Sequence, residues 1–130
     1  MAKLNVGGEI KAPILTATET INCDTLNVWF NGAKAFDSGS NANGYYTKFA
    51  DGTLICYGNK TISNYSVTIN YPAIFIDTNY SLVTQFVRDT SLGNNSNSQG
   101  LNSITTTSCV CYSAYKETAT VLWIAIGRWK

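Results

Sequence analysis

The stretch NGYYTKFADGTLICYG, residues 43–58, decides the fold, because it contains two strand-like runs joined by a short turn. Residues 45–50 and 53–58 include aromatic and β-branched side chains, which favour strands. Asp51-Gly52 lies between the two runs, and this dipeptide suits the type I′ turn of a tight hairpin. The stretch therefore predicts an antiparallel β-hairpin as the first unit of a β-sheet.

The sequence after this hairpin continues as short β-type runs without a helical pattern. Apolar and polar residues alternate, or β-branched residues gather, near residues 67–71, 80–86, 104–112 and 118–127. A polar stretch at residues 89–100 has the composition of a long surface loop. About five to seven short strands with turns between them predict an all-β protein, an antiparallel β-sandwich.

Composition divides the chain into three parts. Residues 37–44, DSGSNANG, contain no large apolar residue and indicate a loop or linker. Residues 1–36 would then form an extended N-terminal segment, and residues 45–130 would form the β-sandwich knob.

The N-terminal segment has the two-residue period of an amphipathic strand. A lone strand of this kind does not offset its ordering entropy unless its apolar row is covered. Two arrangements are open: several copies of the chain wrap round a common axis as an extended stem, or the segment packs on its own domain as an edge strand. In the first arrangement, the expected contacts between the copies, which are the stem contacts of a trimer if the number of copies is three, are Leu4, Val6, Ile10 and Ile14.

Charge and composition argue against nucleic acid and membrane as partners. Nine Lys or Arg oppose eight Asp or Glu, which gives little attraction for phosphates or anionic lipid. The apolar runs are far shorter than the roughly 20 residues of a membrane span, and the N-terminus lacks a signal-peptide core. We therefore expect synthesis in the cytoplasm and reduced, half-buried thiols in place of disulfides. The cysteines are Cys23, Cys56, Cys109 and Cys111.

The residue types present argue against an enzyme. The sequence has no histidine, which excludes Ser-His-Asp and Cys-His catalysis and histidine zinc sites. Cys109 and Cys111 share one face of an expected strand, and burial explains them better than a metal. We therefore predict no catalytic residue, no metal and no cofactor. Turn formation explains the carboxylates better than catalysis, and they are Asp37, Asp51, Asp77, Asp89, Glu9, Glu19 and Glu117.

Aromatic residues are abundant, with eight Tyr, five Phe and three Trp. Trp123 stands in an apolar run and is expected in the core. Trp129 is expected to be exposed or packed on a neighbouring subunit. Several tyrosines could line a glycan-binding surface, although ordinary strand positions explain any single one better. They are Tyr45, Tyr46, Tyr65, Tyr80, Tyr112 and Tyr115.

Three segments, in order, resemble motifs of the C-terminal domain of bacteriophage tail-fibre proteins. Residues 43–58 are similar to the opening "NGxxTKFxDGTLIxxG", residues 71–80 to the middle "YPxxF…TxY", and residues 123–127 to the closing "W-x-A-I-G". The N-terminal residues resemble the shaft motif "GGxIxAPxLTAT" but are shorter than a usual shaft. Asp51-Gly52 as hairpin turn and residues 123–127 as closing strand carry over as architecture, and the resemblance implies a homotrimer.

The resemblance implies a receptor-binding tail-fibre protein, a homotrimeric virion component that recognises a host-surface glycan or protein. Its N-terminal segment would join other tail or capsid proteins. The alternative is a structural head-fibre or decoration protein without receptor binding, and a glycan depolymerase using Asp77 or Asp89 is the least favoured. The polar stretch 89–100 is the first candidate for receptor contact, and its expected contacts are Asp89, Ser91, Asn94, Asn95, Asn97 and Gln99.

Overall fold

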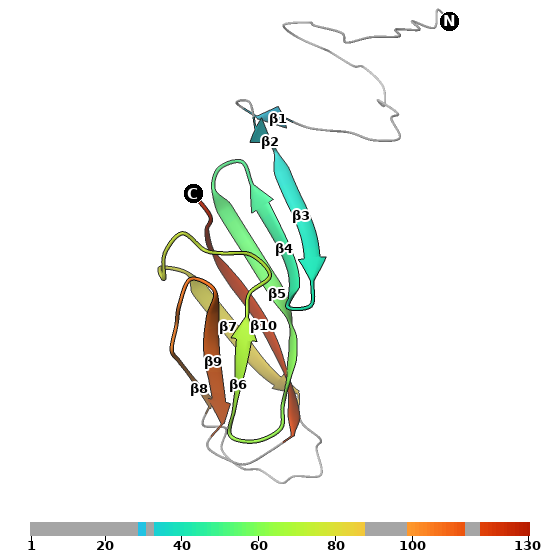
Figure 1. Ribbon diagram of the computed structural model, residues 1–130, viewed down its shortest axis with the longest axis vertical. Helices are drawn as coiled ribbons and strands as arrows, with labels where there is room; N and C mark the ends of the chain where they lie inside the picture. The colour runs from blue at the N-terminus through green and yellow to red at the C-terminus, as the bar shows by residue number, and fades with distance from the viewer. Residues whose placement is uncertain (1–28, 31–32, 88–98, 114–117) are drawn as a thin grey trace, which may run out of the picture.

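The computed structural model describes residues 29–30, 33–87, 99–113 and 118–130, and within these ranges all regular secondary structure is β-strand (Figure 1). Every pairing between the strands is antiparallel. No helix in the described part of the chain is long and apolar enough to cross a membrane. The prediction of an all-β, antiparallel fold is confirmed.

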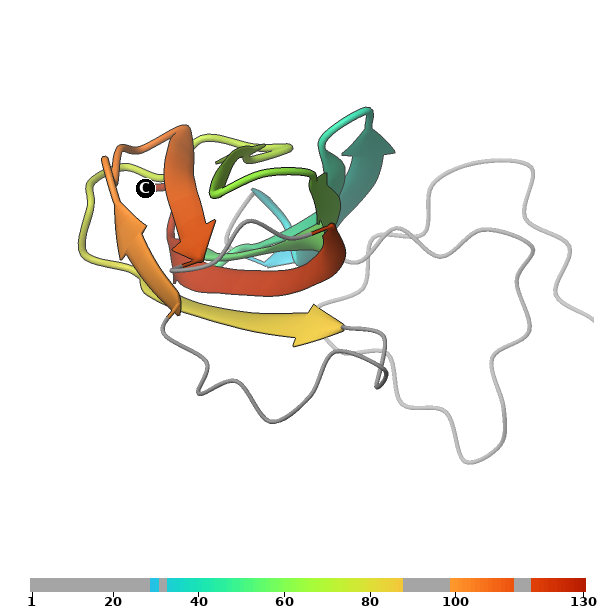
Figure 2. The same cartoon turned by 90° about the horizontal axis from the view of Figure 1, so that it is seen from below.

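Two sheets pack face to face. The larger sheet has the order β3-β4-β5-β10-β7 and the smaller one the order β6-β9-β8. Figure 1 shows the smaller sheet in front of the lower part of the larger one, and Figure 2 shows the two layers edge-on. A separate pair, β1–β2, precedes them. The strands are β1 (Trp29–Phe30), β2 (Ala33–Lys34), β3 (Phe36–Asn41), β4 (Gly44–Phe49), β5 (Thr53–Ile62), β6 (Ser66–Asn70), β7 (Ser81–Val87), β8 (Gln99–Asn102), β9 (Ser108–Ser113) and β10 (Ala119–Arg128).

The core lies between the two sheets, and β10 forms the middle of its larger wall. Alternate residues of β10 are buried, including Val121 and Trp123, while their neighbours face away from the smaller sheet. Trp123 is 4% exposed, which confirms its predicted place in the core. The largest fully buried side chains around it are Leu54, Cys56, Ile62, Ile69, Phe75, Cys109, Cys111 and Val121.

The β4–β5 hairpin is confirmed, but the predicted type I′ turn is wrong. That turn needs positive φ at both central residues, and Ser103 is the only described non-glycine residue with positive φ. Gly52 has φ 97°, and its N–H donates to the carbonyl of Phe49 at 3.0 Å. The Asp51 carboxylate accepts a hydrogen bond from the Thr53 N–H at 2.8 Å. A longer loop therefore closes this hairpin, with one left-handed glycine at its end.

Two polar segments that were expected to be loops contain strands. The expected linker 37–44 contains most of β3, which pairs with β4 from Phe36↔Phe49 to Asn41↔Gly44. Gln99 and Gly100, expected in the contact loop, begin β8. Both are edge strands with few apolar residues. Main-chain hydrogen bonds to a single neighbouring strand define them, so the sequence shows no alternation of apolar and polar residues there. The knob thus has more strands than the sequence indicates. The division into stem, linker and knob stays a prediction.

The three described cysteines are free thiols inside the core. Cys109 and Cys111 are both fully buried, which confirms that they share the inner face of their strand, although burial is deeper than the half-buried state expected. Burial raises the pKa of the Cys56 thiol to about 11. These thiols therefore act as small core side chains.

The remaining predictions for the N-terminal segment fall outside the described residues. Cys23 and the stem contacts Leu4, Val6, Ile10 and Ile14 belong to residues 1–28. Their roles stay predictions.

Candidate functional site

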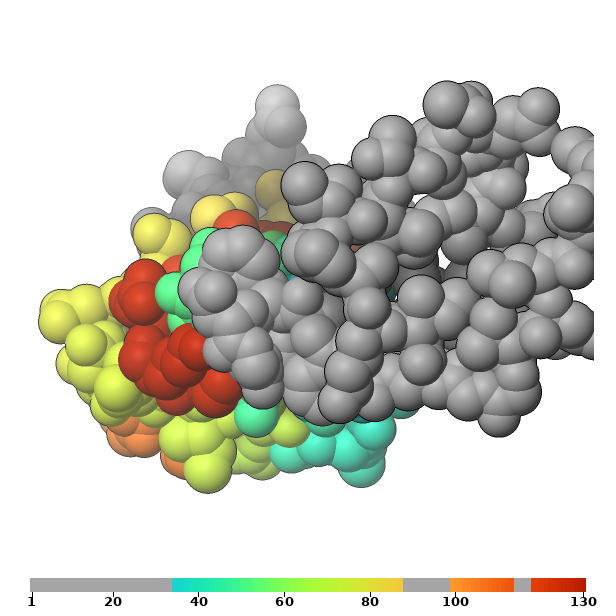
Figure 3. Space-filling model, turned by 90° about the horizontal axis from the view of Figure 1, so that it is seen from above, coloured from blue at the N-terminus to red at the C-terminus, as the bar shows by residue number. Residues whose placement is uncertain are grey.

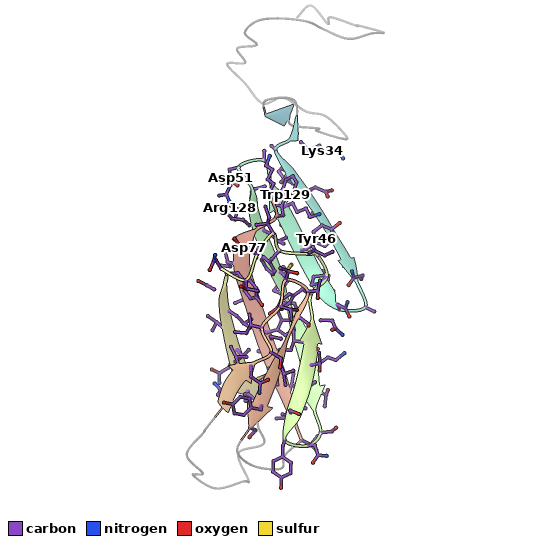
Figure 4. The ribbon with its side chains drawn as sticks, turned by 60° about the vertical axis from the view of Figure 1, so that its left-hand side comes forward. Lys34, Tyr46, Asp51, Asp77, Arg128 and Trp129 are labelled. Atoms are coloured by element: carbon purple, nitrogen blue, oxygen red, sulfur yellow. The ribbon has the colours of Figure 1, made fainter. Side chains whose placement is uncertain are left out.

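An open groove of about 770 Å³ lies at the end of the knob where β3 and β4 extend past the smaller sheet. Strand β4 supplies Tyr46 and Lys48, the segment between β6 and β7 supplies residues 72–76, and the chain end supplies Trp129. Figure 4 shows Tyr46 and Trp129 near each other at this end. Figure 3 looks onto the same end, where the red C-terminal residues lie beside the yellow-green segment. We call this surface the aromatic groove.

Hydrogen bonds fix the walls of the aromatic groove. The Asn41 side-chain amide donates to the carbonyl of Pro72 at 3.0 Å, which ties the β3–β4 turn to the segment opposite. The Trp129 indole N–H donates to the carbonyl of Phe49 at 2.9 Å. The main-chain N–H of Ile76 donates to the carbonyl of Arg128 at 2.8 Å. These bonds join three parts of the chain, so the groove is formed before any ligand arrives.

Lys48 is the one cationic residue among the described residues that line the aromatic groove. The Lys48 ammonium is 5.6 Å from the ring centroids of both Tyr46 and Trp129, within the range of cation–π contacts. None of the described residues that line the groove is acidic. Asp37 lies opposite Lys48 in the β3–β4 register, but the described structure has no ion pair between them. The charge of Lys48 is therefore available to a ligand.

The structure separates the tyrosines that were grouped as glycan-binding candidates. Of the described ones, only Tyr46 lines the aromatic groove. Tyr80 is largely internal, with its hydroxyl 2.9 Å from that of Tyr71 and donating to the carbonyl of Thr105 at 2.8 Å. Burial raises the pKa of both of these phenols. The others are Tyr45, Tyr65 and Tyr112, exposed away from the groove, and Tyr115, which lies outside the described residues.

The expected receptor-contact residues do not line the aromatic groove in the described part of the chain. Gln99 lies exposed on β8, where it pairs with Ser113. The contact role of these residues stays a prediction. Those outside the described ranges are Asp89, Ser91, Asn94, Asn95 and Asn97.

Two of the carboxylates confirm the turn interpretation. Asp51 and Asp77 each accept a hydrogen bond from the main-chain N–H two residues further on, both at 2.8 Å. The bond from Thr53 holds the pKa of Asp51 below its usual value. Asp37 differs, because it lies within strand β3. Glu9, Glu19, Asp89 and Glu117 lie outside the described residues.

The opposite side of the larger sheet carries a second notable surface, which we call the outer face. One row crosses four strands in register: Tyr45 on β4, Tyr57 on β5, Ile124 on β10 and Val83 on β7. The rings of Tyr45 and Tyr57 stack with centroids 5.3 Å apart. Val83 is 64% exposed and Ile124 is 38% exposed. Further exposed apolar residues on this face are Leu122, Ile126 and Val87.

The outer face is free of charge over most of its described area. The residues alternating along β10 from Thr120 to Ile126, and those paired with them on β5 and β7, are all uncharged. A shallow hollow of about 190 Å³ opens on this sheet, bordered by Val83, Leu122 and Ile124. An antiparallel sheet that faces water normally presents polar side chains there. The outer face thus has the character of a covered surface.

Neither surface was predicted from the sequence as a site. Lys48 and Asn41 are ordinary strand residues in the pattern, and only the fold brings them to Pro72 and Trp129. The sequence does contain an indication of the outer face, because Leu122, Ile124 and Ile126 alternate with the core residues of the same apolar run. A strand that is apolar on both faces indicates burial on both sides.

The family comparison decides the class of protein. Residues 48–128 match the family described as "Putative tail fiber protein gp53-like, C-terminal". The chain belongs to this tail fibre family. The tail fibre protein is accordingly a component of a virion tail appendage. No curated protein matches the sequence.

Solved structures of pyocin fibres share the fold of this chain. A C-terminal part of the R2 pyocin fibre of P. aeruginosa is similar with a TM-score of 0.54 and 20% identity, over 72% of this chain and 26% of that one. The R1 pyocin fibre of P. aeruginosa is similar with a TM-score of 0.51 and 17% identity, over 71% of this chain and 28% of that one. The matched part of this chain thus spans about a quarter of each of those solved C-terminal fibre chains.

Proposed function

We propose that this chain is the tip of a homotrimeric tail fibre that attaches the virion to a glycan or protein on the host surface. The observation that carries the proposal is the uncovered apolar outer face. Single chains that stay monomeric rarely expose a contiguous apolar surface of this kind. A fibre assembled from copies of the chain would cover it.

Identical copies are the partner that best fits the outer face. Its centre lacks charge and carries Tyr45, Tyr57 and Ile124, which is the composition of the centre of a subunit interface. Three copies around one axis would bring three outer faces together in a closed arrangement. The same axis would let the N-terminal strands cover one another's apolar rows. Other tail proteins would then attach through the N-terminal segment.

Trimer formation would leave the aromatic groove available for the host. The groove and the outer face lie on opposite sides of the larger sheet, because Tyr46 and Lys48 alternate with Tyr45 and Thr47 along β4. Three grooves on one fibre tip would bind a repetitive surface by multivalency, so each site could be weak.

Matched substitutions test the trimer in the full-length chain. Ile124→Lys places a charge in the centre of the outer face, whereas Ile104→Lys changes an isoleucine that is 46% exposed between β8 and β9. We expect light scattering to give three times the chain mass of 14.2 kDa for the wild type and for Ile104→Lys. Ile124→Lys should give the single-chain mass, because burying an unpaired ammonium is costly. A monomeric wild type would refute the trimer.

Binding to cells tests the attachment role. Fluorescently labelled trimer should bind cells of a susceptible host, and Ile124→Lys should bind them at least about tenfold more weakly, because the avidity of three sites is lost. A trimer that binds no susceptible cells would instead support a structural part of the virion without receptor binding.

A further inference from the structure

We infer that the aromatic groove binds a saccharide that carries an acidic group, either a carboxylate or a phosphate. This inference rests on the proposed attachment function and adds the ligand class and the residues that recognise it. Lys48, Tyr46 and Trp129 are the residues that the inference assigns to binding.

The shape of the groove suits a short oligosaccharide. At about 770 Å³ it falls within the size range of small-molecule sites, and it is open along the surface, as a site for one stretch of a long polymer must be. Polar groups line it beside the rings. The hydroxyls of Ser40 and Thr106 form no hydrogen bond with described residues, so they remain free for sugar hydroxyls.

The aromatic rings provide flat surfaces for the C–H faces of sugar rings. The ring of Tyr46 lies against Gly39, where even a Cβ atom would come within 2.9 Å of the Tyr46 hydroxyl. The Trp129 indole N–H already donates to Phe49. Trp129 is therefore held in place at one edge and presents a ring surface and no donor to the ligand.

Lys48 supplies the preference for an acidic sugar. Its ammonium lies 5.6 Å from both ring centroids, and the lining residues that the structure describes include no acidic one. A cation–π contact leaves the three N–H donors able to bind a carboxylate or phosphate, and such charge-assisted hydrogen bonds are strong. The Lys130 ammonium, 4.8 Å from the Trp129 ring centroid, is a second cation beside the groove. Two lysines do not suit nucleic acid, which makes many phosphate contacts.

A glycan array tests the ligand class with the full-length trimer. The array carries bacterial surface oligosaccharides with uronic acids, with phosphate groups, and with neither. We expect binding to acidic members, and whichever of the two acidic sets binds identifies the source of the charge. Binding should weaken as ionic strength rises, because salt screens exposed charges.

Matched lysine variants test the site. Lys48→Ala should weaken binding to the acidic sugar at least about tenfold, since a hydrogen bond to a charged group is lost, while Lys48→Arg should keep most of it. Lys60→Ala is the control, because it removes the same charge from an exposed residue about 20 Å away along β5. Trp129→Ala should weaken the binding of acidic and neutral sugars alike, because both kinds of sugar would stack on this ring.

The outcomes separate the inference from the proposed function. Equal binding of acidic and neutral sugars, or no effect of Lys48→Ala on a bound acidic sugar, would overturn the inference. So would host-cell binding without any sugar bound on the array, which would leave attachment standing and indicate a protein receptor. Loss of the trimer in Lys48→Ala would also overturn it, because the groove would then be a subunit contact. Failure to bind host cells would remove attachment itself.

Discussion

The two faces of the larger sheet show how one strand can serve two different surroundings. On the inner face, Trp123 of β10 is 4% exposed under the smaller sheet, and beyond that cover the face continues into the aromatic groove. On the outer face, the neighbouring residue Ile124 is 38% exposed although it is just as apolar. The inner face shows where the core of one chain ends. The outer face shows that apolar sequence can extend past that core, toward a surface that other copies would cover.

The largest difference between the two faces is expected in the free energy of unfolding, when one isoleucine on each face is truncated to alanine. Ile62→Ala on the fully buried side should lower the free energy of unfolding by about 2–5 kcal/mol, because it leaves a cavity in the core. Ile126→Ala on the outer face should lower the free energy of unfolding of the monomer by about 0.5 kcal/mol or less. Urea denaturation in the monomeric Ile124→Lys background measures both changes. Similar costs for the two would mean that the outer face is already covered within one chain.

A smaller difference in the free energy of unfolding is expected from removing one polar group on each face. Trp129→Phe deletes the indole N–H that binds the carbonyl of Phe49 beside the groove. It should lower stability by at least about 0.5–1.5 kcal/mol, the usual net value of one hydrogen bond, because the phenyl ring also fills less space than the indole. Tyr57→Phe is the control on the outer face and should stay within about 0.5 kcal/mol. If Trp129→Phe had no effect on thermal unfolding, the indole bond would not be holding the chain end in place.

The smallest effect on stability at neutral pH is expected from the buried thiol of Cys56. Burial raises its pKa to about 11 from a usual value of 9.0. Because the folded pKa lies above the unfolded one, this thiol leaves stability intact below pH 9 and lowers it as the pH rises toward 11. At pH 8 it should resist iodoacetamide until the chain unfolds.

A thiol introduced next to Cys56 in the sequence compares the accessibility of the outer face with that of the core. In Tyr57→Cys the new thiol would stand on the outer face, where Tyr57 is 45% exposed. It should react quickly with iodoacetamide in monomeric Ile124→Lys chains and slowly in the assembled protein, as followed by peptide mass spectrometry. Equal rates in both would show that copies do not cover this part of the face.

Sequence reasoning found those elements whose side chains are buried in a regular pattern. The hairpin around Asp51-Gly52 and the core position of Trp123 follow from strand propensity and alternation. Strands β3 and β8 were missed because polar edge strands are held by main-chain bonds, which leave little trace in residue type. The turn at Asp51 differs from the expected type because its side chain bonds to Thr53 and only Gly52 takes positive φ.

The groove was not predictable for a different reason. It joins Tyr46 and Lys48 on one strand to Pro72 and Trp129, which are far away along the chain. The sequence marked Trp129 as a residue near the surface, but its neighbours depend on how the two sheets are packed. Any site made from three separate segments has this property, since no local pattern records which segments will meet.

The packing of the chain end has a practical consequence for experiments with this protein. Trp129 bonds to Phe49 and Gly52, and Lys130 lies 4.8 Å from the Trp129 ring. An affinity tag placed after Lys130 would therefore emerge at the rim of the groove, next to the rings that we assign to the ligand. A tag there would compete with sugars for the same space. Binding experiments thus need a free C-terminus or a tag that is cleaved away completely.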